Sequence, residues 1–157
     1  MPTDHELMQE AIDLAVTRMR EGHGGPFGAL IVRQGEVISR GFNRVTSTLD
    51  PTAHAEIDAI RKACRQLGDF RLAGCEIFIN CEPCPMCLAA LYWAGIDKIT
   101  YAATRRDAAA IGFADEEIYT EIGKELGQRA IPMVQLMRQE ALSAFTAWQA
   151  WEEKIPY

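Results

Sequence analysis

The start of the chain alternates hydrophobic and polar positions with the period of a helix. Apolar side chains recur every three or four residues, at Leu7, Ala11, Leu14 and Ala15. Thr3 and Glu6 have the spacing of a capping box, in which each side chain accepts a hydrogen bond from the other residue's backbone N–H. The pattern therefore predicts a helix that begins at Thr3 and ends near Gly22.

Two runs rich in β-forming residues come next. The segments "PFGALIVR" and "VISRGFNRV" are joined across Gln34 and Gly35, which are suited to a tight turn. This arrangement predicts an antiparallel hairpin. The polar stretch "TSTLDPT" that follows it is interpreted as a loop.

The middle of the chain alternates between helix and strand patterns. A helix is predicted from about Thr52 to Gln66, with Gly68 beyond it as a stop signal. "CEIFIN" has the composition of a strand, "MCLAALYWAG" is predicted to be a largely buried helix that ends at Gly95, and "DKITYAA" is another strand. A hairpin followed by this alternation is typical of a sheet covered by helices on both faces.

The C-terminal third continues with a short helical stretch near "DAAAIG" and a helix from about Asp115 to Gly123. "IPMVQLM" then has the pattern of a fifth strand, and a final helix runs through "ALSAFTAWQAWEEK". The most polar connector, "GKELGQRA", is where we expect the C-terminal strand and helix to hinge away from the rest.

Length and charge narrow the class of protein. A chain of 157 residues has the usual size of one domain, and no apolar stretch approaches the roughly 20 residues that cross a bilayer, so we expect a soluble cytoplasmic protein. Five cysteines, an odd number, favour metal binding or burial over a disulfide framework. The net charge of −6 leaves no basic stripe for a phosphate backbone, which disfavours nucleic acid and suits a small uncharged substrate.

The segment "CEPCPMC" carries the strongest chemical pattern. Cys84 and Cys87 lie three apart, and in the first turn of a helix the unpaired N–H groups and the helix dipole favour metal-binding thiolates. Pro83 and Pro85 fix the approach of the chain to that turn. Two thiolates do not complete a site, and His54 is the one obvious further ligand.

His54 lies at the start of the predicted second helix, with Glu56 two residues later. His54, Cys84 and Cys87 would make a three-ligand metal site with a fourth position for water, which is typical of catalytic rather than structural zinc. Glu56 would then be a base beside the metal. The simpler alternative is a capping histidine and two buried cysteines. Cys81, at the end of a strand, is interpreted as buried and structural.

The segments "HAE" and "PCPMC" resemble the His-X-Glu and Pro-Cys-X-X-Cys pair of the cytidine deaminase superfamily. "GGPFGA", "FNRV", "DPTAHAEI", "CEPCPMCLAALYWA", "AAAIGFADEEIY" and the terminal tyrosine together resemble the small bacterial guanine deaminases over nearly the whole chain. The resemblance implies a cytidine deaminase-like α/β fold, a three-layer α/β/α sandwich with a central mixed five-stranded sheet. It also implies a single deaminase domain over residues 1–157.

The same resemblance implies zinc-dependent hydrolysis of guanine to xanthine and ammonia, in purine catabolism or salvage. One zinc ion per subunit would carry the nucleophilic hydroxide, and Glu56 would shuttle protons from the water to a ring nitrogen and the departing amine. The partner is then a small purine, with no membrane and no nucleic acid.

Further roles are implied residue by residue. Asn43 would contact the edge of the base, and the backbone N–H of Ala55 would face the developing oxygen. Asp115 would be a second acidic group near the exocyclic amine, although "GFAD" leaves open whether Asp115 or Glu116 serves. Without the resemblance, Asn43 would be a turn residue and Asp115 an N-cap.

Three aromatic residues complete the implied site. Phe27 and Phe113 would pack on the faces of the purine ring, although such residues more often belong to the core. Tyr157 would close the pocket of a neighbouring subunit, in a homodimer that exchanges residues 131–157. Trp93 should face away from the metal of its own subunit and serve the core or an interface.

Other functions remain open on these motifs. A guanosine deaminase fits them, and so does a tRNA adenosine deaminase, although an RNA enzyme must hold several phosphates and this chain has more acidic than basic residues. The alternative that is not an enzyme is a structural zinc module, in which a protein side chain fills the fourth coordination position.

Overall fold

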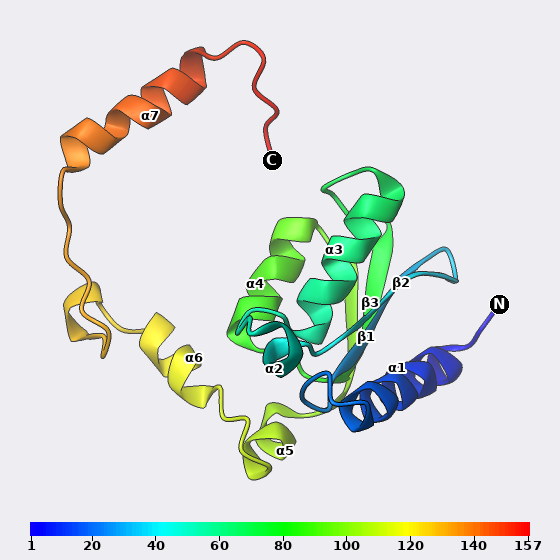
Figure 1. The fold of residues 1–157 in the computed structure, drawn as a ribbon. Coiled ribbons are helices and arrows are strands. Elements are labelled where there is room, and N and C mark those ends of the chain that lie inside the picture. Colours follow the sequence, from blue (N-terminus) through cyan, green and yellow to red (C-terminus); the bar gives the residue numbers. More distant parts are fainter. The chain divides into compact units, whose positions relative to one another are not determined.

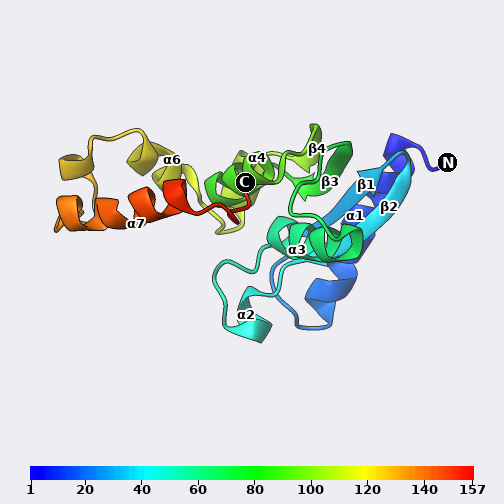
Figure 2. The same ribbon diagram turned by 90° about the horizontal axis from the view of Figure 1, so that it is seen from above.

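A four-stranded mixed sheet organises the N-terminal part of the chain (Figure 1). The computed structural model describes residues 1–157 as two compact units, Met1–Glu117 and Ile118–Tyr157, and each is described by itself. The strands are β1 (Gly28–Arg33), β2 (Glu36–Phe42), β3 (Cys75–Cys81) and β4 (Lys98–Ala103). They follow the order β2-β1-β3-β4, which Figure 2 shows from above with β2 and β4 at opposite edges.

The predicted hairpin is confirmed. β1 pairs antiparallel with β2, and Gln34 and Gly35 connect them with positive φ angles of 52° and 80°. Such a two-residue turn matches the twist of the paired strands. β1 also pairs antiparallel with β3, whereas β3 and β4 are parallel and are joined by a helix.

Helices cover both faces of this sheet, as the alternating pattern predicted. α1 (Asp4–Arg20) packs on one face and has the predicted capping box between Thr3 and Glu6. α3 (Ala55–Leu67) and α4 (Pro85–Ala94) pack on the other face. Successive side chains of β1 point to opposite faces of the sheet. Leu30 and Val32 belong to the hydrophobic cluster under α1, and Ala29 and Ile31 belong to the cluster under α3 and α4.

Shorter elements complete the first unit. α2 (Val45–Thr48) is a single helical turn at the start of the segment predicted to be a loop, and α5 (Arg105–Ala110) matches the short helical stretch. None of the helices combines the length and the apolar character that a membrane crossing requires.

The second unit contains most of α6 (Glu116–Ile122), a 3-10 turn at Leu126–Gln128 and α7 (Arg138–Ala150). The fifth strand predicted at "IPMVQLM" does not form here: residues 132–137 have no regular secondary structure, and Val134 and Leu136 are more than four-fifths exposed. A strand needs a hydrogen-bonded neighbour, which composition alone does not provide. Within one chain, four of the five predicted strands are therefore formed.

α4 also differs from its prediction. One face is buried through Cys87, Leu91 and Ala94, but Tyr92 and Trp93 are 79% and 74% exposed, so the helix is only half buried. The core position considered for Trp93 is excluded. An uninterrupted apolar sequence predicts burial on all sides, and it cannot distinguish the core from a surface that another molecule covers.

Gly41 sets the distance between β2 and α3. A Cβ atom at this position would lie 2.1 Å from the carbonyl oxygen of Ala55 and 2.4 Å from the backbone nitrogen of Ala59. Both contacts are with backbone atoms, which cannot move aside as a flexible side chain can. The absence of a side chain therefore lets the strand pack directly against the first turns of the helix.

We predict that Gly41→Ala lowers the free energy of unfolding by about 3 kcal/mol, because the added methyl group forces strand and helix apart. Denaturant titration measures the change. Gly127→Ala is the matched control, since a Cβ atom there would meet nothing within 4 Å. Equal effects of the two substitutions would contradict the close approach.

Candidate metal centre

The amino ends of α3 and α4 bring the three predicted metal ligands together. His54 is the N-cap of α3, Cys84 is the N-cap of α4, and Cys87 lies in the first turn of α4. His54 Nδ1 lies 3.5 Å from the sulfur of Cys84 and 3.5 Å from that of Cys87. All three ligand atoms lie within 4.8 Å of one another, although His54 is about thirty positions before the two cysteines in the sequence.

These distances fit a zinc ion. Tetrahedral coordination with Zn–N of about 2.05 Å and Zn–S of about 2.3 Å separates the nitrogen from each sulfur by about 3.6 Å. The observed separations of 3.5 Å match this value. The donor set of one imidazole and two thiols also suits zinc, and it leaves one of four coordination positions without a protein ligand.

The local electrostatics favour a thiolate at Cys84. A hydrogen bond from the Cys87 thiol, followed by one from His54, lowers the pKa of Cys84 to about 4. The same hydrogen bond and burial raise the pKa of the Cys87 thiol. The Cys84 thiolate in turn raises the pKa of His54. A divalent cation between the sulfurs would favour the thiolate form of both cysteines.

Glu56 lies beside this cluster without belonging to it. Its side chain is 4% exposed, and a hydrogen bond links it with the Cys87 thiol. Burial raises the pKa of Glu56 to about 7, and the negative charge of Cys84 contributes in the same direction. A carboxyl group with a pKa near neutrality can both accept and return a proton.

Asn43 follows β2 and is buried. Its side-chain oxygen accepts hydrogen bonds from the backbone N–H groups of Gly25 at 3.2 Å and Val45 at 3.1 Å. The bond to Val45 is the turn contact expected without the resemblance. Because the oxygen is occupied by the loops, the Nδ2 group is the part of Asn43 that can donate to another molecule.

Ala55 is fully buried as the first residue of α3, where a backbone N–H has no acceptor within its own helix. The His54 side chain does not cap this turn. The N–H of Ala55 therefore lies next to the metal ligands and is suited to an oxygen ligand.

Phe27 and Phe113 contact each other, with ring centroids 5.0 Å apart and planes at 87°. In this arrangement only one of them can lie flat on a planar base while the other presents its edge. Phe113 is 44% exposed, whereas Phe27 packs against the buried core.

Asp115 lies directly before α6 and is half-buried, with its Oδ1 atom buried and without a hydrogen-bond partner. Burial raises its pKa, and the Cys84 thiolate adds to the effect, so the carboxyl group lies within electrostatic reach of the ligand cluster. Glu116 is exposed. Cys81 is buried as predicted, and burial raises its pKa to about 11.

Tyr157 belongs to the second unit and is 81% exposed, so its part in the site remains a prediction. Sequence reasoning missed one buried residue near the cluster, Asp58, which is 7% exposed. Its only sequence signal is Lys62 four positions later, a spacing typical of solvent-exposed ion pairs on helices.

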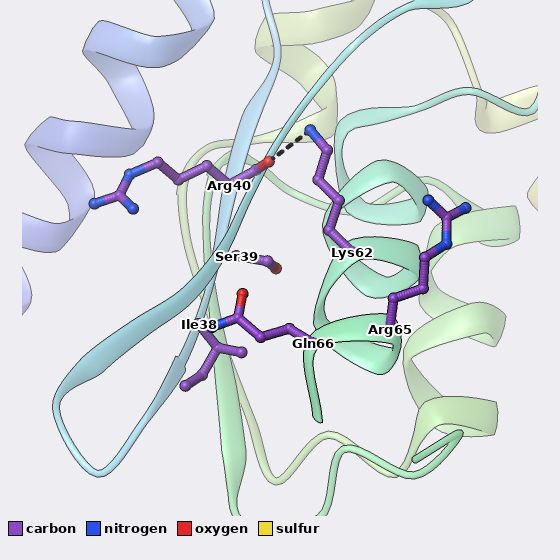
Figure 3. A pocket seen from close by; sticks show the side chains of 6 residues that line it. All are labelled: Ile38, Ser39, Arg40, Lys62, Arg65 and Gln66. Carbon is purple, nitrogen blue, oxygen red and sulfur yellow. Dashed lines mark hydrogen bonds between the residues drawn. The ribbon is translucent and has the colours of Figure 1, made fainter. Parts of the chain in front are cut away.

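An open pocket of about 530 Å³ lies elsewhere, between β2 and the second half of α3 (Figure 3). It is lined by Ile38, Ser39, Arg40, Lys62, Arg65 and Gln66. Lys62 Nζ donates to the carbonyl oxygen of Arg40 at 2.9 Å, and the Arg40 side chain pairs with Glu10. Since none of the metal ligands lines it, this pocket is not the site of the chemistry.

Comparison with known proteins agrees with this geometry. Residues 1–103 match the family described as the cytidine and deoxycytidylate deaminase zinc-binding region, and the chain belongs to this deaminase family. It is similar to the guanine deaminase of Bacillus subtilis, with 48% identity over 155 residues, which covers 98% of this chain and 99% of that protein.

The X-ray structure of guanine deaminase from Bacillus subtilis superimposes with a TM-score of 0.96 at 47% identity, covering 100% of this chain and 99% of that one. A tRNA-specific adenosine deaminase of Aquifex aeolicus is 49% identical over 78 residues, but the match covers 50% of this chain and 52% of that protein.

The raised pKa of Glu56 predicts a pH-dependent stability in the metal-free protein. The pKa of Glu56 is about 7 in the folded state, against an ordinary value of 4.5, so the folded state binds more protons than the unfolded state between these values and stability falls as pH rises through them. Relative to Glu56→Gln, the wild type should lose about 3 kcal/mol between pH 4.5 and 8.

Denaturant titrations of the chelated proteins at several pH values measure this difference. Glu76→Gln is the control, because Glu76 is a partly exposed carboxylate that pairs with Lys98 at the surface. A pH-independent difference between wild type and Glu56→Gln would show that Glu56 is not a desolvated carboxyl group.

Proposed function

We propose that this protein is a zinc-dependent guanine deaminase, which hydrolyses guanine to xanthine and ammonia. The observation that carries the proposal is a His-Cys-Cys ligand cluster with a buried, unliganded Glu56 beside it, in a chain similar along its whole length to a guanine deaminase. The five free cysteines suit the reducing cytoplasm, where thiolate ligands persist.

A zinc ion held by His54, Cys84 and Cys87 would lower the pKa of a water molecule and so supply the nucleophile. Glu56 takes the proton that this water loses and delivers it to a ring nitrogen of guanine. Glu56 then takes the proton of the hydroxyl group that C2 has gained and transfers it to the exocyclic amine. The C2=O bond of xanthine forms as the bond between C2 and the amine nitrogen breaks, and the amine departs as ammonia. A pKa near 7 is suited to this alternation.

The remaining residues orient the base. Asn43 Nδ2 donates a hydrogen bond to the edge of guanine, and the N–H of Ala55 faces the oxygen that develops at C2. Asp115 accepts a hydrogen bond from the exocyclic amine. Its buried Oδ1 atom has no hydrogen-bond partner, whereas Glu116 is exposed, and this favours Asp115 over Glu116 for the role. One of Phe27 and Phe113 stacks on the ring, and the other contacts it with its edge.

A free base is favoured over RNA as the substrate. The chain carries a net charge of −6, and several of its basic side chains pair with acidic ones, among them Arg40 with Glu10 and Lys62 with Asp58. The similarity to tRNA adenosine deaminases covers between 50% and 69% of this chain in the sequences compared, whereas the similarity to a guanine deaminase covers 98%. Phosphate contacts over several nucleotides would need more unpaired basic residues.

We further propose that the protein is a homodimer that exchanges residues 131–157. β4 is an edge strand with unpaired backbone groups on one side, and residues 131–137 contain apolar side chains that are exposed within one chain. Pairing of this segment with β4 of a second chain would supply the fifth strand, and Tyr157 would then close the partner's pocket.

We predict that Glu56→Gln retains one zinc ion per chain while kcat for ammonia release from guanine falls by about 10³-fold or more, because the proton shuttle is lost. Glu82→Gln is the control, since this carboxylate accepts from the Arg105 N–H and should change kcat by less than about threefold. Loss of zinc together with activity would favour a structural zinc module.

The same assay should compare guanine with guanosine, adenine, cytosine and a tRNA substrate. We expect turnover of guanine that does not vary with salt concentration, because the substrate is uncharged. Deamination of tRNA that weakens steeply with salt, without turnover of guanine, would overturn the proposed substrate.

Segment exchange can be tested by mixing two inactive variants, Glu56→Gln and a deletion of Tyr157. If the tail completes the partner's site, each mixed dimer contains one complete site, and refolding an equal mixture should restore about a quarter of wild-type activity. No restoration in a mixture that forms mixed dimers would show that Tyr157 serves the site of its own chain, and a deletion variant with wild-type activity would show that it serves neither site.

A further inference from the structure

Asp58 connects the two segments that carry the proposed chemistry. It lies in α3, four residues after His54 and two after Glu56, and it is 7% exposed. Its Oδ2 atom accepts a hydrogen bond from the backbone N–H of Phe42 at 3.2 Å. Phe42 is the last residue of β2 and directly precedes Asn43.

The Phe42 N–H would have no acceptor in the sheet. β2 is an edge strand, and the next N–H along it, that of Asn43, donates to the carbonyl oxygen of Phe27 on the side of β1. Because successive N–H groups point to opposite sides of a strand, the Phe42 N–H points away from β1. The Asp58 carboxylate supplies the acceptor that a further strand would otherwise provide.

Arg44, the residue after Asn43, also bonds to the start of α3 and to the segment directly before it. Arg44 donates from Nη1 to Asp58 Oδ1 at 3.4 Å, and its backbone N–H donates to the carbonyl oxygen of Ala53 at 2.9 Å. Ala53 directly precedes His54. Both neighbours of Asn43 are therefore bound to the chain segment that begins α3.

Two cations balance the charge of Asp58. Lys62 Nζ lies 2.7 Å from Oδ2 and 4.9 Å from the centre of the Phe42 ring, and Arg44 lies on the other carboxylate oxygen. An ion pair between Asp58 and Lys62 alone would stabilise α3 slightly and would not connect it to another element. The contacts of Asp58 with Phe42 and Arg44 instead cross from the helix to the strand.

We propose that Asp58 is a positioning residue, which fixes the Asn43 side chain relative to the helix that carries His54 and Glu56. The proposal rests on the proposed role of Asn43 in binding guanine. Gly41 brings the strand against the helix, but a close approach does not determine the direction of the Asn43 amide. The N–H groups of Gly25 and Val45 orient the amide within its loop. The hydrogen bonds that Asp58 accepts from Phe42 and Arg44 fix the backbone on both sides of Asn43 relative to α3.

The test compares Asp58→Ala and the milder Asp58→Asn with Asp97→Asn. Asp97 also accepts from a backbone N–H, that of Gly74, but it directly precedes β4, at the edge of the sheet where β3 and β4 begin, whereas the two cysteine ligands follow the end of β3. We expect the Asp58 variants to keep one zinc ion per chain and to lose about 10–100-fold in kcat/KM for guanine. Asp97→Asn should lose less than about threefold.

A double-mutant cycle with Asn43→Ala separates positioning from a general loss of stability. If Asp58 acts through Asn43, Asp58→Asn should cost less than about threefold in the Asn43→Ala background. Effects that multiply independently would overturn the proposal. An Asp58→Asn protein with wild-type kcat/KM would overturn it as well.

A measurement without substrate distinguishes failure of this inference from failure of the proposed function. In the zinc-loaded protein, the side-chain NH₂ signals of Asn43 and the backbone amide of Phe42 can be followed by NMR. We expect faster exchange of both in Asp58→Asn and unchanged exchange in Asp97→Asn. Unchanged exchange in both variants would overturn the positioning role, whereas a wild type inactive on guanine would overturn the proposed function alone.

Discussion

The account depends on the convergence of two helix starts at one point. α3 and α4 are separated in sequence by β3, yet His54 and the two cysteines come within 4.8 Å because both helices lie on the same face of the sheet and begin side by side. Close packing without a side chain at Gly41 sets the position of α3 on β2. The Cys84 N-cap, whose sulfur accepts from the Cys87 N–H, begins α4.

This arrangement assigns metal binding and proton transfer to different side chains. The imidazole and the two sulfurs point at one another and can hold a cation, whereas Glu56 is buried next to them with a pKa near neutrality. Had Glu56 been a ligand, its carboxylate could not accept the proton of an attacking water. Its burial is unfavourable for the charged form, and the same burial makes Glu56 useful as a proton carrier.

Local patterns predicted most of the first unit, and nonlocal contacts account for the errors. Features that depend only on neighbouring residues were predictable from the sequence. They include the capping box at Thr3, the turn at Gln34 and Gly35, and the Gly68 stop signal. The predicted fifth strand at "IPMVQLM" is not formed within one chain, because a strand requires a hydrogen-bonded neighbour that local sequence does not specify. The largely buried helix predicted at α4 is only half buried, because apolar composition does not say which face of a helix is covered, and of the two positions considered for Trp93 only the core is excluded.

In the candidate site, too, local patterns were predictable and nonlocal contacts were not. The ligand spacing and Glu56 were predictable because helix starts follow short motifs, and the resemblance added Asn43, Ala55 and the aromatic pair. The perpendicular rings of Phe27 and Phe113 depend on packing across the molecule, as do the contacts of Asp58 with Phe42 and Arg44, so neither followed from spacing.

Zinc K-edge X-ray absorption on the metal-loaded protein tests the central claim most directly. The account predicts two sulfur ligands at about 2.3 Å and two lighter ligands at about 2.0 Å, one from His54 and one from solvent. Addition of a competitive purine ligand or a change of pH should alter only the second light ligand. A spectrum with three or four sulfurs, or a lighter shell that responds to neither change, would contradict a zinc centre open to substrate.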